Sequence, residues 1–411
     1  MIQRLLPRFP TFALSFGLSL CVACGDDEID TPIEDAGVSD DAGTGTDASV
    51  SGPDSGLPDA EPRPKTGIGV LGYESHSIAE VELLEIGTQG LRTPRDVAFN
   101  PQGDGELWVI NRADDSTVTY FNVGTSEQTE RKIIDPFALH FMEEPSSLAF
   151  GAPDRFATCQ ESRNTYNNRT APNDFMGPAL WSSDFAVYGI TNPDAVDFVG
   201  ADLGSHLDML HESPLCMGIA WDVDNVYWTF DGLTGSISRY DFQSDHGAGY
   251  DDHSDGIIAR YVVGQVSRVE NVPSHMELDH ATGLLYVADT GNARIAVLDT
   301  ASGIRGTNLR VKETGTQLYT MESAIFNTLV DSVTGDLIHP SGLALVGDLI
   351  YVTDNSNSRI TAFKKDTGER VDWLDTGFPE RSLMGLTFDE AGRMYLVDAV
   401  GGRVLRISAK P

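Results

Sequence analysis

Residues 284–298 read Leu-Leu-Tyr-Val-Ala-Asp-Thr-Gly-Asn-Ala-Arg-Ile-Ala-Val-Leu, and the same pattern returns at 349–363 and at 394–407. The later copies read Leu-Ile-Tyr-Val-Thr-Asp-Asn-Ser-Asn-Ser-Arg-Ile-Thr-Ala-Phe and Met-Tyr-Leu-Val-Asp-Ala-Val-Gly-Gly-Arg-Val-Leu-Arg-Ile. In each copy, β-branched and aromatic residues flank a short polar cluster, which predicts a strand, a tight turn and a second strand. Recurrence of this β-hairpin along the chain indicates a repeat architecture.

Three weaker copies of the hairpin precede these, at 107–121, 156–188 and 226–240, which makes six units. In the second copy, the returning strand is expected at 185–188. Each hairpin follows a short apolar strand, and the six apolar strands begin at Asp96, Ser147, Gly218, His275, Gly342 and Gly385. Because propeller blades are four-stranded sheets arranged around a channel, the six units predict six blades.

The last unit ends at Ser408, directly after its third strand. A spare strand, Ile-Ala-Glu-Val-Glu-Leu-Leu-Glu-Ile at 78–86, stands before the first unit. We expect this strand to complete the last blade and to close the ring. The sequence therefore predicts an all-β fold, a closed six-bladed β-propeller over residues 66–411.

The hydrophobic-Tyr-Val-Asp, turn, Arg-Ile pattern of the last three hairpins resembles bacterial NHL-repeat β-propellers. The resemblance extends over about 91–408 and is weak in the second unit, where Gln160 replaces the Asp. The offset from Asp289 to Arg294 is repeated in the other two strong copies. A carboxylate at this place can accept N–H bonds of the turn while the Arg opens the next strand. We interpret the repeated Asp and Arg residues as structural.

The N-terminus has the layout of a bacterial export signal. Arg4 and Arg8 precede an apolar run at 12–20, which is shorter than the about 20 residues needed to span a bilayer. The following Val-Ala-Cys-Gly resembles the lipobox of bacterial lipoproteins, in which the signal is cut before a lipid-carrying Cys. This resemblance implies a signal peptide at 1–23 and lipidation of Cys24, in the outer membrane or elsewhere in the cell envelope. An ordinary cleaved signal without lipid is the alternative.

Residues 24–65 are built mainly from Asp, Gly, Ser, Thr, Ala, Pro and Glu, a composition with too little apolar surface to fold. We expect an acidic, disordered tether that holds the propeller away from the membrane. The formal net charge of the chain is -34, so phosphate backbones are repelled and nucleic acid is not expected as a partner. A closed ring has no long free sheet edge, and a monomer is expected.

Once Cys21 is removed with the signal and Cys24 is acylated, Cys159 and Cys216 remain. They fall in neighbouring blades and an oxidising compartment is expected, so the pair is a candidate disulfide. Two separately buried thiols are the alternative.

Two constellations in the long insertions are candidate metal sites. His206, Asp208 and His211 lie within six positions and could ligate a transition metal, or be ordinary hydrogen-bonded loop residues. A second stretch, 245–256, is rich in carboxylates and glycines and could form a calcium loop or a solvated hairpin tip. Its candidate calcium ligands are Asp245, Asp251, Asp252 and Asp255. We expect the two constellations on opposite faces of the ring.

His275 is a third candidate metal ligand, because it stands among six equivalent positions expected to line the channel mouth. In the peptidylglycine α-amidating lyases, which share the NHL-type propeller, histidines from three blades hold zinc at such positions. This chain resembles that arrangement only at His275. His206 or His211 could reach the same mouth from a connecting loop.

Two functions remain open. The first is a lipid-anchored binding or scaffold propeller for a protein, peptide or glycan, with any calcium structural. The second is a metal-dependent lyase or hydrolase with its site at the channel mouth. The sequence contains no Gly-x-Ser-x-Gly elbow and no glycine-rich phosphate loop, so no catalytic residue is assigned and the binding interpretation is preferred.

Overall fold

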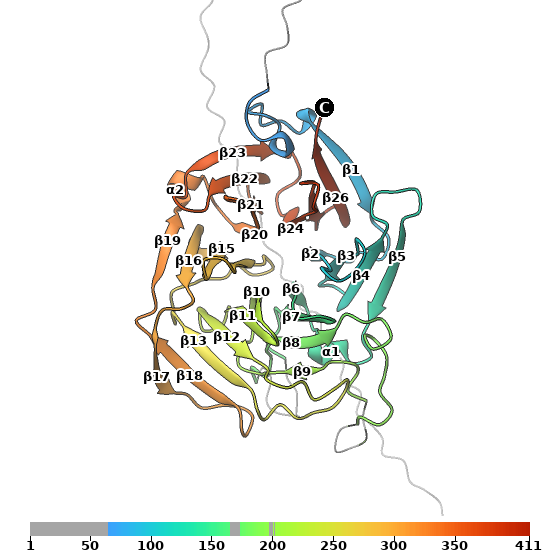
Figure 1. Cartoon of the computed structure of the whole chain (residues 1–411), viewed down its shortest axis with the longest axis vertical. Coiled ribbons are helices and arrows are strands. Elements are labelled where there is room, and N and C mark those ends of the chain that lie inside the picture. The colour runs from blue at the N-terminus through green and yellow to red at the C-terminus, as the bar shows by residue number, and fades with distance from the viewer. Residues whose placement is uncertain (1–64, 165–172, 197–199, 201) are drawn as a thin grey trace, which may run out of the picture. The chain divides into compact units, whose positions relative to one another are not determined.

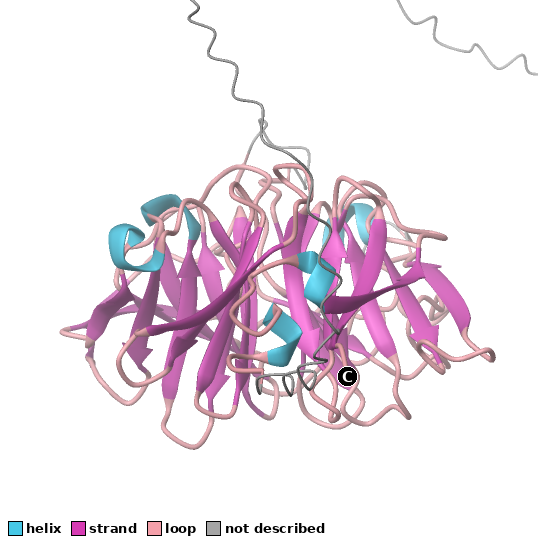
Figure 2. Cartoon of the chain, turned by 90° about the horizontal axis from the view of Figure 1, so that it is seen from above, coloured by secondary structure: helices cyan, strands magenta, loops and turns pink. Residues whose placement is uncertain are grey.

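The computed structural model describes residues 65–164, 173–196, 200 and 202–411. Signal peptide, lipidation site and most of the tether, as predicted from the sequence, lie outside the described residues. Residues 63–411 form one compact unit. In this unit the strands form six sheets arranged in a ring around a central axis (Figure 1), and they run between the two faces of the ring (Figure 2). The prediction of a six-bladed β-propeller is confirmed.

The first two blades follow the chain in order. Blade 1 consists of β2 (Pro94–Phe99), β3 (Leu107–Asn111), β4 (Ser116–Phe121) and β5 (Thr129–Ile134). After the short helix α1 (Ala138–Phe141), blade 2 consists of β6 (Pro145–Phe150), β7 (Arg155–Gln160), β8 (Ala179–Ser182) and β9 (Asp208–Met209).

The expected third strand of blade 2 was placed wrongly at 185–188. That segment is a turn, and the strand is β8, which lies just before it. The apolar residues that suggested a strand are instead used in packing: Phe185 stacks on Trp108 with ring centroids 5.1 Å apart, and Tyr188 is fully buried.

Blade 3 is larger than the expected four strands. It contains β10 (Cys216–Val223), β11 (Val226–Asp231), β12 (Ser236–Asp241) and β13 (Ile257–Tyr261), and it is extended by β18 (Gln317–Glu322) and β17 (Ile304–Asn308). The β17–β18 hairpin belongs in sequence to blade 4, but β18 pairs in parallel with β13. This hairpin therefore joins the outer edges of two neighbouring blades.

Blade 4 consists of β14 (Met276–Asp279), β15 (Leu284–Asp289), β16 (Arg294–Asp299) and β19 (Phe326–Val330), with a single 3-10 turn, η3 (Thr290–Asn292), in its hairpin. After α2 (Ser332–Gly335), blade 5 consists of β20 (Pro340–Val346), β21 (Leu349–Asp354), β22 (Arg359–Lys364) and β23 (Arg370–Asp375). Blade 6 contains β24 (Leu383–Phe388), β25 (Met394–Asp398) and β26 (Arg403–Ala409).

The N-terminal segment closes blade 6. Two 3-10 turns, η1 (Gly69–Leu71) and η2 (Ile78–Glu80), precede β1 (Val81–Gly87), which pairs antiparallel with β26 from Val81 opposite Ala409 onward. The predicted closing strand is confirmed, although it begins three residues later than expected. Its buried side chains, Val81 and Ile86, pack into the apolar layers on either side of blade 6. The ring is thus closed by hydrogen bonds between the two ends of the propeller.

The repeated Asp and Arg residues stabilise the hairpin turns, as expected. Asp289 accepts a bond from Arg294 at 2.7 Å, and Asp398 accepts one from Arg403 at 2.8 Å and one from a turn N–H at 2.8 Å. Asp354 instead accepts four backbone N–H bonds, and its arginine turns to another carboxylate. Among the described residues, no helix is long and apolar enough to cross a membrane.

Candidate functional site

The innermost strand of every blade faces the central channel, and these are the six apolar strands expected from the sequence: β2, β6, β10, β14, β20 and β24. Side chains from opposite blades meet within the channel. Asp96 accepts a hydrogen bond from the Ser147 hydroxyl at 3.0 Å, and its Oδ2 lies 3.5 Å from Nε2 of His275. Gly385 permits this approach, because a Cβ there would lie 2.3 Å from a carboxylate oxygen of Asp96.

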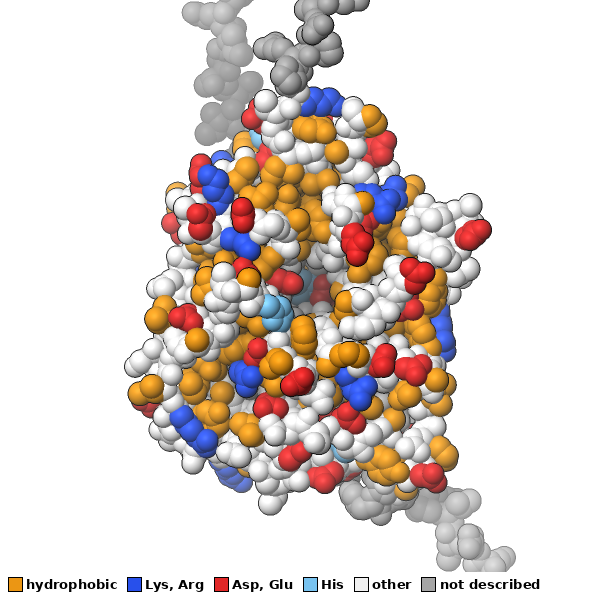
Figure 3. Space-filling model, in the orientation of Figure 1, with side chains coloured by type: hydrophobic (Ala, Val, Ile, Leu, Met, Phe, Trp, Pro, Cys, Tyr) orange, Lys and Arg blue, Asp and Glu red, His pale blue; other side chains and the backbone are white. Residues whose placement is uncertain are grey.

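Asp96, Ser147 and His275, together with the neighbouring inner strands, line a cavity of about 380 Å³, which we call the cup. A hollow with acidic and histidine side chains is visible at the centre of the ring in Figure 3. Most residues that line the cup are apolar, among them Phe99, Phe150, Trp221, Leu345 and Phe388, but polar atoms make up more of its exposed surface than apolar atoms do. Among the described residues that line it, the charged groups are the carboxylates of Asp96 and Glu277, and none is Lys or Arg. The cup therefore combines aromatic and aliphatic side chains with negative charge.

Glu277 is the carboxylate best placed to meet a ligand. Its side chain reaches the water of the channel, and within the described part of the chain it makes no hydrogen bond or ion pair. The surrounding protein and, secondarily, the charge of Asp96 raise the pKa of Glu277 to about 7. Asp96, by contrast, already accepts bonds from two backbone N–H groups and from Ser147. An unpaired carboxylate with a raised pKa in a cavity is a typical mark of a functional site.

His275 lines the cup but is largely buried. Its side chain is 5% exposed, and its Nε2 lies 3.3 Å from the Ser146 carbonyl and 3.5 Å from Asp96. The structure does not bring His206 or His211 to it: His206 stacks on Phe141 and His211 on Phe175. Glu277 was not predicted as a site residue, although it stands two residues after His275 in the predicted strand, a spacing that places both on the same face.

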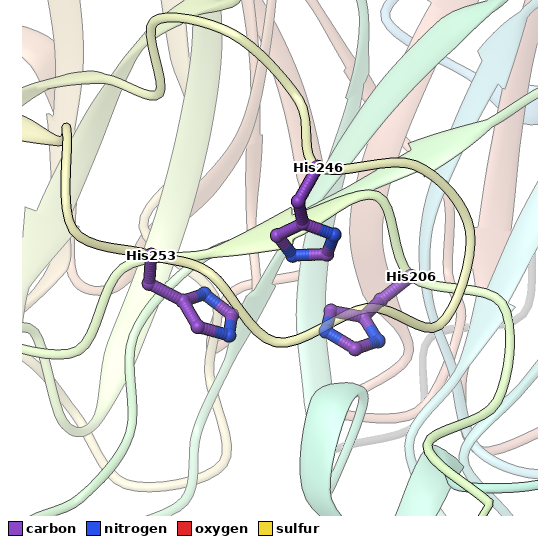
Figure 4. A group of neighbouring side chains, drawn as sticks. All are labelled: His206, His246 and His253. Carbon is purple, nitrogen blue, oxygen red and sulfur yellow. The ribbon is translucent and has the colours of Figure 1, made fainter. Parts of the chain in front are cut away.

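A second site lies between blades 2 and 3. His206, in the connection before β9, approaches His246 and His253 from the loop between β12 and β13, and one ligand atom from each lies within 4.8 Å of the others. Figure 4 shows the three imidazole rings turned toward a common space. The expectation that the two histidine-containing stretches lie on opposite faces was wrong. The β12–β13 loop instead folds back over β9, as the bond from the His246 amide to the Leu207 carbonyl shows.

Two of these histidines are held with a free nitrogen facing the shared space. Nδ1 of His206 lies 3.0 Å from the Leu203 carbonyl, and Nδ1 of His246 lies 2.8 Å from the Gly247 carbonyl. Because a carbonyl only accepts, each Nδ1 carries the proton and each Nε2 carries a lone pair. Both Nε2 atoms are buried and have no hydrogen-bond partner among the described residues. Burial lowers the pKa of His206 and lowers that of His246 to about 4.

His253 lies between two carboxylates. Its Nδ1 is 3.1 Å from Asp208 and its Nε2 is 2.9 Å from Asp251. Burial lowers the pKa of His253, but the two carboxylates outweigh burial and raise it to about 10. Burial also raises the pKa of Asp208 to about 6, and its Oδ2 has no hydrogen-bond partner in the described residues.

The other predicted metal ligands are used elsewhere. His211 is 2.8 Å from Glu313, a residue that the sequence analysis missed, and burial lowers the pKa of His211. The four candidate calcium carboxylates have four different partners: Asp245 pairs with Arg155, Asp251 with His253, Asp252 with Ser254, and Asp255 with the amide of Ser244.

Cys159, in β7, and Cys216, at the start of β10, are joined by a disulfide with a Cα–Cα distance of 5.2 Å. The bond connects blades 2 and 3 close to the channel-facing strands. Both residues are fully buried.

Comparison with known proteins gives one family match. Residues 337–363, which cover most of β20–β22, match the family model of the NHL repeat. The propeller carries an NHL repeat. A comparison with curated proteins finds no significant match.

Solved structures with a similar arrangement share little sequence. An auxiliary nutrient binding protein from Bacteroides ovatus is 11% identical, with a TM-score of 0.46, over 77% of this chain and 69% of that one. A virginiamycin B lyase from Staphylococcus aureus with quinupristin is 11% identical (TM-score 0.46; 81% and 89%). A luciferin-regenerating enzyme is 12% identical (TM-score 0.47; 80% and 95%). No ligand or activity follows from similarity at this level.

Proposed function

We propose that this protein is an exported binding propeller that takes an amine-bearing apolar group, such as the side chain of a basic peptide, into its channel cup. The observation that carries the proposal is Glu277, an unpaired carboxylate in a cavity that also presents aromatic side chains. A protonated amine would pair with this carboxylate while its apolar stem contacts the aromatic wall.

The size and charge of the cup support this ligand class. Its volume of about 380 Å³ lies at the lower end of the roughly 300–1,000 Å³ range of small-molecule sites, enough for a side chain or a small amine. The lining charges, from Asp96 and Glu277, are negative, so an anionic group would be repelled.

The location we propose is the cell envelope. The lipobox-like sequence around Cys24 and the acidic stretch at 24–65 support a lipid anchor with a long tether. In this arrangement, residues 66–411 form the binding domain and work as a monomer. A zinc-dependent lyase at the channel is not favoured, because His275 is already in contact with Asp96 and Ser146.

The test is isothermal titration calorimetry with phenethylamine and with its uncharged analogue 2-phenylethanol. The proposal predicts that wild-type protein binds the amine more tightly than the alcohol, and that Glu277→Gln removes this preference. Glu322→Gln, at an exposed position on β18, serves as the matched control and should bind as wild type does. Equal binding of amine and alcohol by wild-type protein, or an unchanged preference in Glu277→Gln, would contradict the proposal.

A further inference from the structure

The histidine cluster between blades 2 and 3 is separate from the cup and has no part in the proposed ligand binding. Its residues are buried: His206 and Asp208 are 0% exposed, and the side chains of His246 and His253 are 4% and 5% exposed. We propose that His206, His246 and His253 hold one divalent transition-metal ion of the zinc class, with Asp208 as the neighbouring carboxylate ligand.

The first argument is that polar atoms without partners converge at this place. Nε2 of His206, Nε2 of His246 and Oδ2 of Asp208 are all buried without a hydrogen bond among the described residues. A buried acceptor without a partner is destabilising, and native proteins seldom tolerate several together. A cation between the two imidazole nitrogens would satisfy both of their lone pairs, and Asp208, whose Oδ1 lies 4.0 Å from Nε2 of His246, is the nearby carboxylate.

The second argument is orientation. His206 and His246 each donate Nδ1–H to a backbone carbonyl, which fixes the ring and leaves Nε2 as the ligand atom. Histidines that bind metals nearly always have their other ring nitrogen held in this way. In a tetrahedral zinc site, ligand nitrogens at 2.0–2.1 Å from the ion are about 3.3 Å apart. The three ligand atoms here lie within 4.8 Å of one another, so the loop that carries His246 and His253 needs to move only a short distance toward His206 to form a tetrahedral site.

The type of donor selects the type of ion. Imidazole nitrogens suit zinc, copper and nickel, whereas calcium and magnesium prefer oxygen ligands. His253 now lies between the carboxylates of Asp208 and Asp251, which compensate a positive charge at this position. On binding the ion, one ring nitrogen of His253 would exchange its contact with a carboxylate for the metal. The predicted calcium loop is thereby reassigned as part of a nitrogen-rich site.

The role of the ion is structural. Because the ligands are buried, the site offers no open path for a substrate, and a fourth ligand from Asp208 would complete it. The ion would tie the long β12–β13 loop of blade 3 to the connection that enters β9 of blade 2. Residues on the two sides of this tie are far apart in sequence, so the metal would act as a cross-link between neighbouring blades.

The experiment uses the full chain without a histidine tag, purified without chelators and then titrated with zinc, with cobalt(II) and with calcium. We expect one zinc ion per chain, a tetrahedral cobalt(II) spectrum, and no competition by calcium. His246→Gln should weaken zinc binding by more than the roughly 10–100-fold that loss of an outer-shell partner costs. His280→Gln, which changes a histidine at the rim of the cup, is the matched control and should bind zinc as wild type does.

X-ray absorption at the zinc edge of the wild-type protein gives a result that does not depend on how any variant folds. The proposal predicts a first shell of nitrogen and oxygen with the scattering pattern of three imidazoles. It would be overturned by a shell of oxygen alone, by the absence of stoichiometric zinc, or by equal loss of zinc in His246→Gln and His280→Gln.

Discussion

Removal of the disulfide between blades 2 and 3 should lower the free energy of unfolding of the propeller. The size of this effect depends on the number of residues between the two cysteines. The bond joins residues separated by 57 positions. Cross-linking a loop of this length lowers the entropy of the unfolded chain by about 14 cal/mol/K, which corresponds to about 4 kcal/mol at 25 °C. We therefore expect Cys159→Ala/Cys216→Ala to lower the free energy of unfolding by about 4 kcal/mol.

Guanidinium unfolding of residues 63–411, followed by fluorescence, measures this difference. This unit contains Cys159 and Cys216 as its only cysteines, so the comparison is not complicated by Cys24. Reductant should destabilise the wild type by a similar amount and leave the double variant unchanged. The reasoning is refuted if wild type and double variant unfold at the same denaturant concentration, or if the unfolded, unreduced wild type titrates with two free thiols.

Three further predictions concern closure, the repeated turns and the cup. Ile86→Ala in the closing strand should lower the free energy of unfolding by about 2–5 kcal/mol, because the side chain is buried. Leu83→Ala, at a position 42% exposed, should lower it much less. Equal effects of the two variants would contradict the packing of β1. Asp289→Ala removes the buried partner of an arginine that is itself 22% exposed, and it should cost about 1.5–3 kcal/mol. The exposed Asp104→Ala should cost about 0.5 kcal/mol or less, and denaturant titration of both variants checks the difference. In calorimetry, phenethylamine should bind about tenfold more tightly at about pH 8 than at about pH 6. A carboxyl group with a pKa of about 7 is mostly protonated at the lower pH and mostly ionised at the higher pH. Binding that does not depend on pH would exclude Glu277 as the partner.

The sequence was sufficient for the ring and its closure because both depend on local patterns. Strand alternation and turn residues repeat in every unit, and the unpaired strand before the first unit matched the strand missing from the last. The β17–β18 hairpin was not predicted, because its parallel pairing with β13 is a contact between blades that leaves no periodic signal in its own residues. The strand at 185–188 was misplaced for a similar reason: the apolar residues Phe185 and Tyr188 pack on Trp108 and do not belong to a strand.

The sites were predicted only in part. His206 and Asp208 were recognised from their spacing, but their partners His246 and His253 come from a loop about 40 residues later, and only the folding of that loop over β9 brings the two stretches together. Glu277 could have been found from strand alternation, but its raised pKa could not. The pKa of Glu277 is raised by the protein around the channel and by the charge of Asp96, which comes from the opposite side of the ring.

The most direct test of the ligand-binding account is the titration of the Glu277 carboxyl group by carbon-13 NMR, with Glu277→Gln used to assign the signal. In the free protein we expect a midpoint near the pKa of about 7, and phenethylamine should lower it because the amine favours the ionised carboxylate. A midpoint in the ordinary range of a solvated Glu, unchanged by the amine, would contradict the account.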